Sequence, residues 1–564
     1  MIALCINGHA NLRCRGEQLT DRVLLGDEAV AIGAVHAGLT AAYAYPGTPS
    51  TELLEYLLVY AREHGGPHAA WCSNEKTAYE EALGVSFAGR RALVAMKHVG
   101  LNVAADPFIN SALVAIGGGL VLVVADDPGM HSSQNEQDSR FYADFARIIC
   151  LEPANQQEAY QMTREAFDLS EKFHIPVMIR LVTRLAHSRS NVRLLAARTE
   201  NPVSKPADPA AWTLLPANAR RRWRSLIERQ PDFLSYSETC VHNALTLNEN
   251  DRTLGVITTG LARNYFLENV DDLGIEPSHL HVGAYPLPVE KIRRLAGHVE
   301  RVLVLEEGQP FLERLLRGIV SPRAEICGRQ SGHIPPDGEL TPDIVRAALG
   351  LPIRKGIAIS TTLPARPPQL CAGCPHGDSY RAVKTALEPF PGAAVTADIG
   401  CYTLGALAPY GAIQSCVCMG ASVGMAKGAS DAGLRPAVAV IGDSTFLHSG
   451  VTALMDAVAA GTDMTLIILD NETIAMTGGQ PTILPSSRLE KLIVALGVRP
   501  EHFQVLNAHP KHESRNAEII RGEVEHKGLS VIVMVRECVE TVRKKRKEKT
   551  QTEAPVPEAA EVQV

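Results

Sequence analysis

The stretch 438–444, Val-Ala-Val-Ile-Gly-Asp-Ser, is an apolar run that ends in a polar loop, and so is 466–471, Leu-Ile-Ile-Leu-Asp-Asn. Such runs are typical of buried parallel strands, whose carboxyl ends meet at the ligand-binding edge of a doubly wound sheet. Gly442 lets backbone amides approach a phosphate, and Asp443 and Asn471 offer the hard oxygens that Mg²⁺ prefers. The two runs predict a phosphate–magnesium site, although Gly-Asp after a strand is also a common turn.

The bulk composition limits the class of protein. The chain has 564 residues, which is too long for one hydrophobic core, so we expect two to four domains. A net charge of −7 does not indicate a nucleic-acid surface. No apolar run is long enough to span a bilayer, and the N-terminus is a poor signal peptide. We expect a cytoplasmic protein with no nucleic-acid or membrane partner.

The order of apolar and helical stretches divides the chain. Apolar strand-like runs alternate with helical stretches through most of it, which predicts an α/β fold with several doubly wound parallel sheets. The blocks with this pattern are 22–195, 251–352 and 353–540. Residues 1–21 are an N-terminal extension, and 196–250, rich in Pro, Ala and Arg, are expected to be a partly helical linker. The tail, 541–564, is basic at first and is then expected to be disordered.

The phosphate–magnesium motif resembles the Gly-Asp-Gly…Asn signature of thiamine-diphosphate enzymes, with Ser444 in place of the last glycine. The longer string 441–450, Ile-Gly-Asp-Ser-Thr-Phe-Leu-His-Ser-Gly, is similar to the indolepyruvate:ferredoxin oxidoreductase alpha subunits. This resemblance implies that Gly442, Asp443, Ser444 and Asn471 bind thiamine diphosphate. It also implies that Asp443, Asn471 and the carbonyl of Thr473 hold Mg²⁺.

The resemblance extends over residues of about 22–540 and implies a role for each block. The first block corresponds to the thiamine pyrimidine-binding domain, and 353–540 corresponds to the domain that binds the diphosphate and Mg²⁺. The block 251–352 corresponds to a transketolase C-terminal-like domain.

Glu75 is the candidate for the activating carboxylate. Thiamine chemistry needs a carboxylate on the pyrimidine ring, and a dry pocket strengthens that hydrogen bond. Glu75 precedes a predicted helix at 76–89, where the pyrimidine-domain glutamate of thiamine enzymes lies, so the resemblance makes it catalytic. The alternative is an ordinary first-turn glutamate that the helix dipole favours.

Two further loops resemble cofactor-facing loops of the family. Residues 45–50, Tyr-Pro-Gly-Thr-Pro-Ser, resemble the loop whose threonine faces the thiazolium and the substrate, so Thr48 is a catalytic and cofactor-binding candidate. Residues 97–102, Lys-His-Val-Gly-Leu-Asn, match another such loop and add His98 and Asn102. A Pro/Gly turn with a helix cap is the alternative for Thr48, and a structural histidine is the alternative for His98.

Four of the 12 cysteines lie in patterned positions. Cys371 and Cys374 form a C-x-x-C pair, Cys401 follows a Gly, and Cys538 follows the last predicted strand. Separated thiolates of this kind can hold a 4Fe–4S cluster, and the resemblance implies one at these four positions. A structural zinc site and a redox dithiol are the alternatives, and Cys416 and Cys418 could replace one of the ligands.

Two segments raise the question of partners. The polar loop 126–140 contains Glu136 and Arg140, which could meet substrate or a partner subunit or could simply pair with other charges. Relatives continue after the last strand into a ferredoxin-like domain with two Cys-rich runs. This chain has no cysteine after Cys538 and carries the basic run 543–547 instead, which could steer an acidic electron acceptor.

The resemblance implies oxidative decarboxylation of an aryl 2-oxoacid such as indolepyruvate. The acyl group would pass to coenzyme A, and the electrons would reach ferredoxin or a separate ferredoxin-like subunit. A smaller beta subunit is the implied partner, in a hetero-oligomer with two copies of each. The alternatives are a non-redox thiamine-dependent decarboxylase or carboligase, and a scaffold subunit without electron output.

Overall fold

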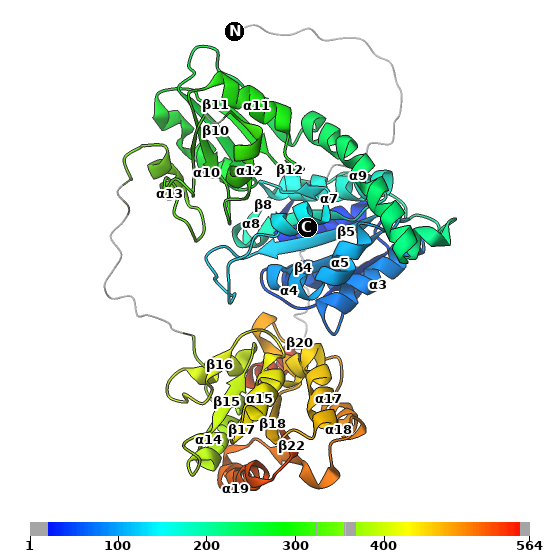
Figure 1. Ribbon diagram of the computed structural model, residues 1–564, viewed down its shortest axis with the longest axis vertical. Coiled ribbons are helices and arrows are strands. Elements are labelled where there is room, and N and C mark those ends of the chain that lie inside the picture. The colour runs from blue at the N-terminus through cyan, green and yellow to red at the C-terminus, as the bar shows by residue number, and fades with distance from the viewer. Residues whose placement is uncertain (1–20, 322–323, 355, 357–367, 553–564) are drawn as a thin grey trace, which may run out of the picture.

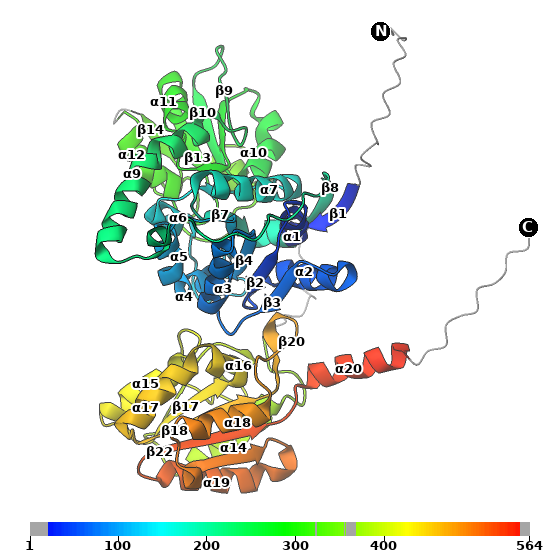
Figure 2. The same cartoon turned by 90° about the vertical axis from the view of Figure 1, so that its right-hand side faces the viewer.

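The computed structural model describes residues 21–321, 324–354, 356 and 368–552, and it contains three α/β units (Figure 1). The first unit lies in the middle of the molecule, the second lies above it, and the third lies below. Helix α20 (Val539–Thr552) carries the basic run and projects away from the third unit (Figure 2). The predicted N-terminal extension, up to residue 20, and the end of the predicted disordered tail, 553–564, lie outside the described residues.

The first unit is built on a sheet of seven strands, which are parallel except for the edge strand β12. The order across the sheet is β12 (Ala284–Tyr285), β6 (Cys150–Leu151), β7 (Val177–Val182), β5 (Leu120–Asp126), β4 (Ala92–Lys97), β2 (Ala41–Ala44) and β3 (His68–Trp71). Its main helices are α1 (Gly26–His36), α2 (Thr51–His64), α3 (Glu75–Phe87), α6 (Arg140–Ala146) and α7 (Gln156–Phe173). Apart from the edge strand β3, the strands are buried, as expected for a parallel sheet covered on both faces.

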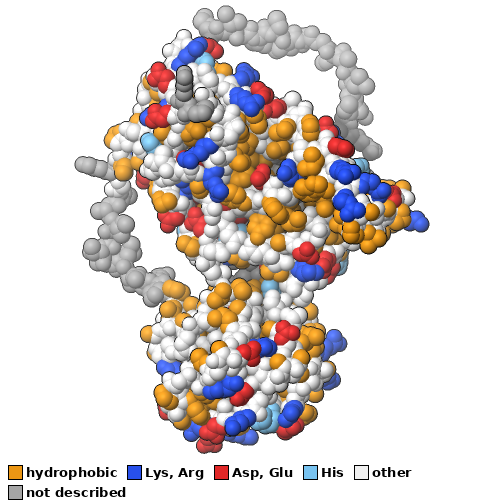
Figure 3. All heavy atoms as spheres, viewed as in Figure 1, with side chains coloured by type: hydrophobic (Ala, Val, Ile, Leu, Met, Phe, Trp, Pro, Cys, Tyr) orange, Lys and Arg blue, Asp and Glu red, His pale blue; other side chains and the backbone are white. Residues whose placement is uncertain are grey.

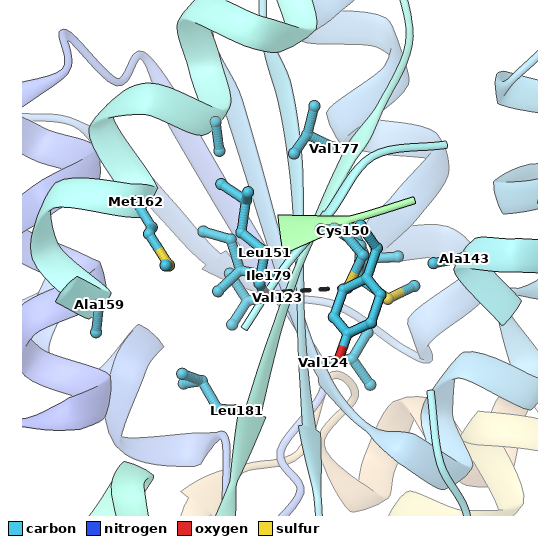
Figure 4. Packing of buried hydrophobic residues seen from close by; sticks show 14 of the residues in the cluster. Val123, Val124, Ala143, Cys150, Leu151, Ala159, Met162, Val177, Ile179 and Leu181 are labelled. Atoms are coloured by element: carbon cyan, nitrogen blue, oxygen red, sulfur yellow. Dashed lines mark hydrogen bonds between the residues drawn. The ribbon is translucent and has the colours of Figure 1, made fainter. Parts of the chain in front are cut away.

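The packing around the centre of this sheet shows both covered faces (Figure 4). Ala159 and Met162 of α7 lie on one side of the strands, and Ala143 of α6 lies on the other. Val123 and Ile179, from the neighbouring strands β5 and β7, are fully buried between them. The first unit is therefore doubly wound, as the sequence predicts.

The second unit has five strands in the order β14 (Glu325–Cys327), β13 (Arg301–Leu305), β10 (Leu254–Thr259), β11 (Ser278–Val282) and β9 (Asn243–Thr246), and only β9 is antiparallel. Its helices include α10 (Ala262–Asn269), α11 (Val289–His298), α12 (Phe311–Ile319) and α13 (Pro342–Ala348). The edge strand β9 comes from the segment expected to be a linker. That segment also contains α9 (Pro216–Thr239), whose Leu226 and Phe233 are buried. These two residues are seven apart and mark an apolar stripe that the surrounding arginines hide in the sequence.

The third unit has six parallel strands in the order β16 (Ser415–Cys416), β15 (Ala394–Ala397), β17 (Ala437–Gly442), β18 (Met464–Asp470), β22 (Leu529–Val535) and β21 (Phe503–Asn507). Val438 and Val440 face a core closed by α14 (Pro375–Leu387) and α19 (Glu513–Glu525). Ala439 and Ile441 face a second core with α15 (Ala421–Asp431), α17 (Val451–Ala460) and α18 (Ser486–Ala495). Alternate residues of one strand thus pack against opposite helical layers.

The first two units are joined by one continuous hydrophobic cluster and by a buried network of charges. Arg140 pairs with Asp138 (2.5 Å) and Glu306 (3.0 Å), and Arg180 pairs with Glu152 (2.5 Å). Arg140 is only 1% exposed and is engaged in these ion pairs, which agrees with the alternative that it pairs with other charges. Buried pairs of this kind are costly to break one partner at a time.

No helix in the described part of the chain is long and apolar enough to cross a bilayer.

Candidate active site

A cavity of about 500 Å³ lies between the first and third units, at the narrow waist visible in Figure 3. Its lining combines loops at the carboxyl ends of strands from both sheets, the edge where such folds bind ligands. The predicted site residues that line it are Thr48, Glu75, Asn102, Cys401, Gly442, Asp443, Ser444, Asn471 and Thr473.

The third unit contributes the loop that follows β17. A side chain at Gly442 would place a Cβ 2.7 Å from the ring of Tyr402, so only glycine fits here. Asp443 is buried, and burial followed by the nearby Asp470 raises the pKa of its carboxyl well above the usual range. One oxygen of each of these two carboxyls has no hydrogen-bond partner in the described structure. Two orphaned carboxylate oxygens fit a divalent cation, which would remove the cost of their burial.

The loop after β18 contributes the other predicted ligands of that cation. The Asn471 amide lies 3.3 Å from Nε2 of His376, and its Oδ1 accepts a hydrogen bond from the Thr473 amide (3.2 Å). Between them Glu472 has φ = 58°, which a non-glycine residue rarely adopts. The backbone of this loop is therefore strained where Asn471 and Thr473 meet the cavity.

The first unit contributes Glu75, at the start of α3. Its Oε2 lies 2.8 Å from Nε2 of His448, which belongs to the third unit. The side chain of Asn74 donates to the carbonyl of His448 (3.0 Å), so the two units are joined at this point. Glu75 packs directly over Gly100, where a Cβ would lie 2.4 Å from Oε1. The carboxylate is thus fixed from both sides and points into the cavity.

Of the remaining predicted residues of the first unit, Thr48 and Asn102 line the cavity and His98 does not. The carbonyl of Thr48 accepts a hydrogen bond from Ser132 Oγ (3.2 Å), and Asn102 Oδ1 accepts one from the Tyr142 hydroxyl (2.6 Å). His98 is buried but is not among the residues that line the cavity, and its burial lowers its pKa. Both of its ring nitrogens are buried without a hydrogen-bond partner among the described residues, so the arrangement decides neither for the cofactor role nor for the structural role of His98.

The four patterned cysteines are close enough to influence one another. The pKa of the Cys401 thiol is raised to about 12, first by burial and then by Cys374, Cys538 and Cys371. The Cys538 amide also donates to the carbonyl of Asn471 (3.3 Å), which connects the cysteines to the predicted cation loop.

A hydrogen bond from Arg536 to the carbonyl of Gly373 (3.3 Å) holds the end of β22 against the C-x-x-C turn. Cys416 interacts with Cys418 and Asp398, and none of the four patterned thiols contributes to its pKa. These electrostatic contacts indicate that the four patterned thiols lie near one another and apart from Cys416. Among the described residues, however, no three of the thiols bring their sulfur atoms within 4.8 Å of one another.

Sequence reasoning assigned no role to several residues of the cavity. His448 bonds to Glu75, His376 bonds to Asn471, and the buried Tyr45 packs its ring 4.7 Å from that of His448. Charges of Glu75 and Asp443, after burial, raise the pKa of Tyr45. A histidine four residues after Ser444 was a usable signal for His448, but its partner lies 373 residues away.

Two doubly wound units meet at one cavity, which Glu75 lines from the first unit and the Gly442 loop lines from the third. Together with the following matches, this arrangement identifies the chain as part of a thiamine-diphosphate-dependent 2-oxoacid oxidoreductase. Residues 32–232 match the family model described as pyruvate flavodoxin/ferredoxin oxidoreductase, thiamine diP-bdg. Residues 398–533 match the thiamine pyrophosphate enzyme C-terminal TPP binding domain. The chain belongs to the family of the indolepyruvate oxidoreductase subunit IorA.

The relatives that show this family are similar over most of their length. The chain is 37% identical to indolepyruvate oxidoreductase subunit IorA of Archaeoglobus fulgidus, over 91% of this chain and 86% of the relative. It is 36% identical to IorA of Thermococcus kodakarensis, over 92% and 85%. A solved 2-oxoglutarate:ferredoxin oxidoreductase from Magnetococcus marinus aligns with a TM-score of 0.49 and 19% identity, over 59% of this chain and 66% of that one.

Proposed function

We propose that the chain is the thiamine-binding subunit of an enzyme that oxidatively decarboxylates an aryl 2-oxoacid, as in indolepyruvate oxidation. One observation carries the proposal: Glu75, Asp443, Asn471 and Cys401 all line the same cavity. The names of the IorA relatives support an indolepyruvate-like substrate. We also propose the domain limits expected from the sequence, with β9 added to the second unit.

The division of labour between cofactor and protein follows from the cavity. Bound thiamine diphosphate would supply the carbanion chemistry, and the chain would orient it and control its protons. Glu75 would share its proton with a nitrogen of the pyrimidine ring, and His448 would hold its carboxyl group in place. The Gly442 loop would cradle the diphosphate, while Asp443, Asn471 and the Thr473 carbonyl would hold Mg²⁺.

The grouped thiols support an iron–sulfur cluster beside this site. We propose that Cys371, Cys374, Cys401 and Cys538 hold one 4Fe–4S cluster. A cubane cluster holds its thiolates farther apart than one zinc ion does, and it can take electrons one at a time. One 2-oxoacid and one coenzyme A would give acyl-CoA, carbon dioxide and a proton, and two electrons would leave through the cluster to two oxidised ferredoxins.

The proposal includes partners. The IorA relatives are named as subunits, which supports a smaller beta subunit in a complex with two copies of each chain. Ferredoxin or a separate ferredoxin-like subunit would accept the electrons. Because free thiols and an exposed cluster need a reducing compartment, we place the enzyme in the cytoplasm.

Composition of the purified protein tests the proposal. The chain and its partner subunit would be prepared anaerobically and analysed for iron, acid-labile sulfide and thiamine diphosphate. About four irons and one thiamine per chain, with coenzyme A-dependent reduction of ferredoxin by indolepyruvate, is the expected result. Thiamine without iron would point to a non-redox decarboxylase, and the absence of both would leave a scaffold subunit.

A further inference from the structure

The cavity has an unbalanced set of charges. Two acids, Glu75 and Asp443, line it, and among its described lining residues Lys97 is the only lysine or arginine. A 2-oxoacid brings a carboxylate into this space, and that carboxylate needs a cation or a set of N–H donors. Lys97 is the last residue of β4, so its side chain starts at the ligand-binding edge of the first sheet.

Lys97 lies beside the loop that carries Thr48. A Cβ at Gly47 would be 3.2 Å from the Cβ of Lys97, so the lysine stem runs along this loop. Its Nζ donates to the carbonyl of Ser132 (2.6 Å), and Ser132 Oγ donates in turn to the carbonyl of Thr48. The ammonium is therefore a close neighbour of the residue expected to face the thiazolium and the substrate.

The ammonium is buried without a counter-ion. Lys97 is 7% exposed, and no carboxylate of the described residues lies within 4.0 Å of its Nζ. The nearest acid that affects it is Asp127, whose carboxylate is already bonded to Ser132, Ser133 and Thr183. Burial lowers the pKa of Lys97 to about 8, as expected for an ammonium that lacks a close anion.

The hydrogen bonds of the Lys97 ammonium group leave one N–H donor available for a ligand. An ammonium has three N–H donors, and Lys97 uses one on the Ser132 carbonyl and a longer one, 3.3 Å, on Ser132 Oγ. An incoming carboxylate would take the remaining donor and supply the missing negative charge. A lysine presents a point charge rather than the rigid fork of arginine, so it binds a carboxylate without fixing it bidentately. This suits a group that must leave as carbon dioxide.

We propose that Lys97 binds the carboxylate of the 2-oxoacid substrate. The inference rests on the proposed function for its substrate class. Two other roles would leave different traces. Lys97 could only hold the Ser132 loop in place, or it could contact the cofactor diphosphate, although the Gly442 loop belongs to the third unit and Lys97 to the first.

A pair of ligands that differ only in charge tests the inference. The thiamine-loaded complex with its partner subunit would be titrated calorimetrically with 3-(indol-3-yl)propionate and with its neutral primary amide. The wild type should bind the acid more tightly than the amide. Lys97→Met should raise the Kd of the acid by about 10- to 100-fold, which corresponds to the loss of one charged hydrogen bond. The Kd of the amide should change by less than about 2-fold in Lys97→Met. Lys97→Arg should restore part of the preference for the acid.

Kinetics and cofactor binding complete the test. Lys97→Met should raise the KM for indolepyruvate by a similar factor and change kcat less. If Lys97→Met weakens the binding of the acid and of the amide equally, the inference is wrong and Lys97 only holds the Ser132 loop in place. A weakened affinity for thiamine diphosphate with an unchanged preference for the acid would overturn it in favour of a diphosphate contact.

The outcomes separate this inference from the proposed function. A wild type that oxidises indolepyruvate, with an acid preference that survives in Lys97→Met, refutes the lysine alone. A wild type with a Lys97-dependent preference for the acid but no 2-oxoacid turnover supports the anion site and refutes the proposed function.

Discussion

Replacing Gly100 by alanine tests whether the position of Glu75 controls catalysis. The new Cβ would lie 2.4 Å from Oε1, 2.6 Å from Cγ and 2.8 Å from Cδ of Glu75. Ordinary contact begins near 3.4 Å, so the glutamate must move by about 1 Å. Rotation of the carboxylate cannot relieve contacts to Cγ and Cδ, so the 2.8 Å bond to His448 should be lost as well.

The expected result is a loss of about 100-fold in kcat/KM, because a misplacement of about 1 Å in an active site can cost that much. Coenzyme A-dependent reduction of ferredoxin by indolepyruvate would be measured, together with the melting temperature. Gly84→Ala is the matched control, since that glycine is also helical and a Cβ there meets nothing within 4 Å.

Both substitutions replace a helical glycine and should gain up to about 1 kcal/mol of helix propensity, so a fold defect would be visible as a difference in melting temperature. A Gly100→Ala enzyme that keeps more than half of the wild-type kcat/KM would refute the assignment of Glu75.

Three other predictions concern the proposed iron–sulfur cluster, the buried Glu307 of the second unit and the basic helix α20. Cys538→Ser should lose most of the bound iron, whereas Cys416→Ser should keep it, and equal iron in both variants would contradict the ligand set. The pKa of Glu307 is raised by burial from 4.5 to about 7, so the wild type should lose stability as pH rises from about 4.5 to 7. Glu307→Gln should reduce the loss of unfolding free energy over this pH range by about 3 kcal/mol, at 1.36 kcal/mol per pKa unit, in urea unfolding at several pH values; an unchanged slope would contradict the assignment. Reversing the charges of Lys544 and Lys547 on α20, whose Arg543 lies near Cys371, should slow ferredoxin reduction at low salt but not at high salt, and an unchanged rate at low salt would exclude steering.

The strands of this protein were predictable because buried parallel strands appear as unbroken apolar runs. The runs at 438–441 and 466–469 correspond to β17 (Ala437–Gly442) and β18 (Met464–Asp470), and their polar ends mark the ligand-binding edge. The place of Glu75 near the start of a helix was predictable for a similar reason, whereas its role as the activating carboxylate rests on the resemblance and stays a prediction. In these cases the signal is local.

Features that depend on two units meeting were not predictable. The bond between Glu75 and His448 and the burial of Arg140 join segments that lie more than 100 residues apart. The nearby Asp138 could equally pair with a surface arginine, and the partner that comes from the second unit, Glu306, lies far away in the sequence. The edge strand β9 was missed because its four residues alternate in exposure and carry no long apolar run.

The distribution of hydrophobic cores has a consequence for how the protein melts. The first two units share one cluster, whereas the third has two of its own, so the chain comprises two cooperative blocks. A ligand held by Glu75 on one block and Asp443 on the other binds only when both are folded. At 100 times its Kd it would add about 2.7 kcal/mol to that state alone. Bound thiamine diphosphate would then couple the unfolding of the two blocks, so that two calorimetric transitions merge into one.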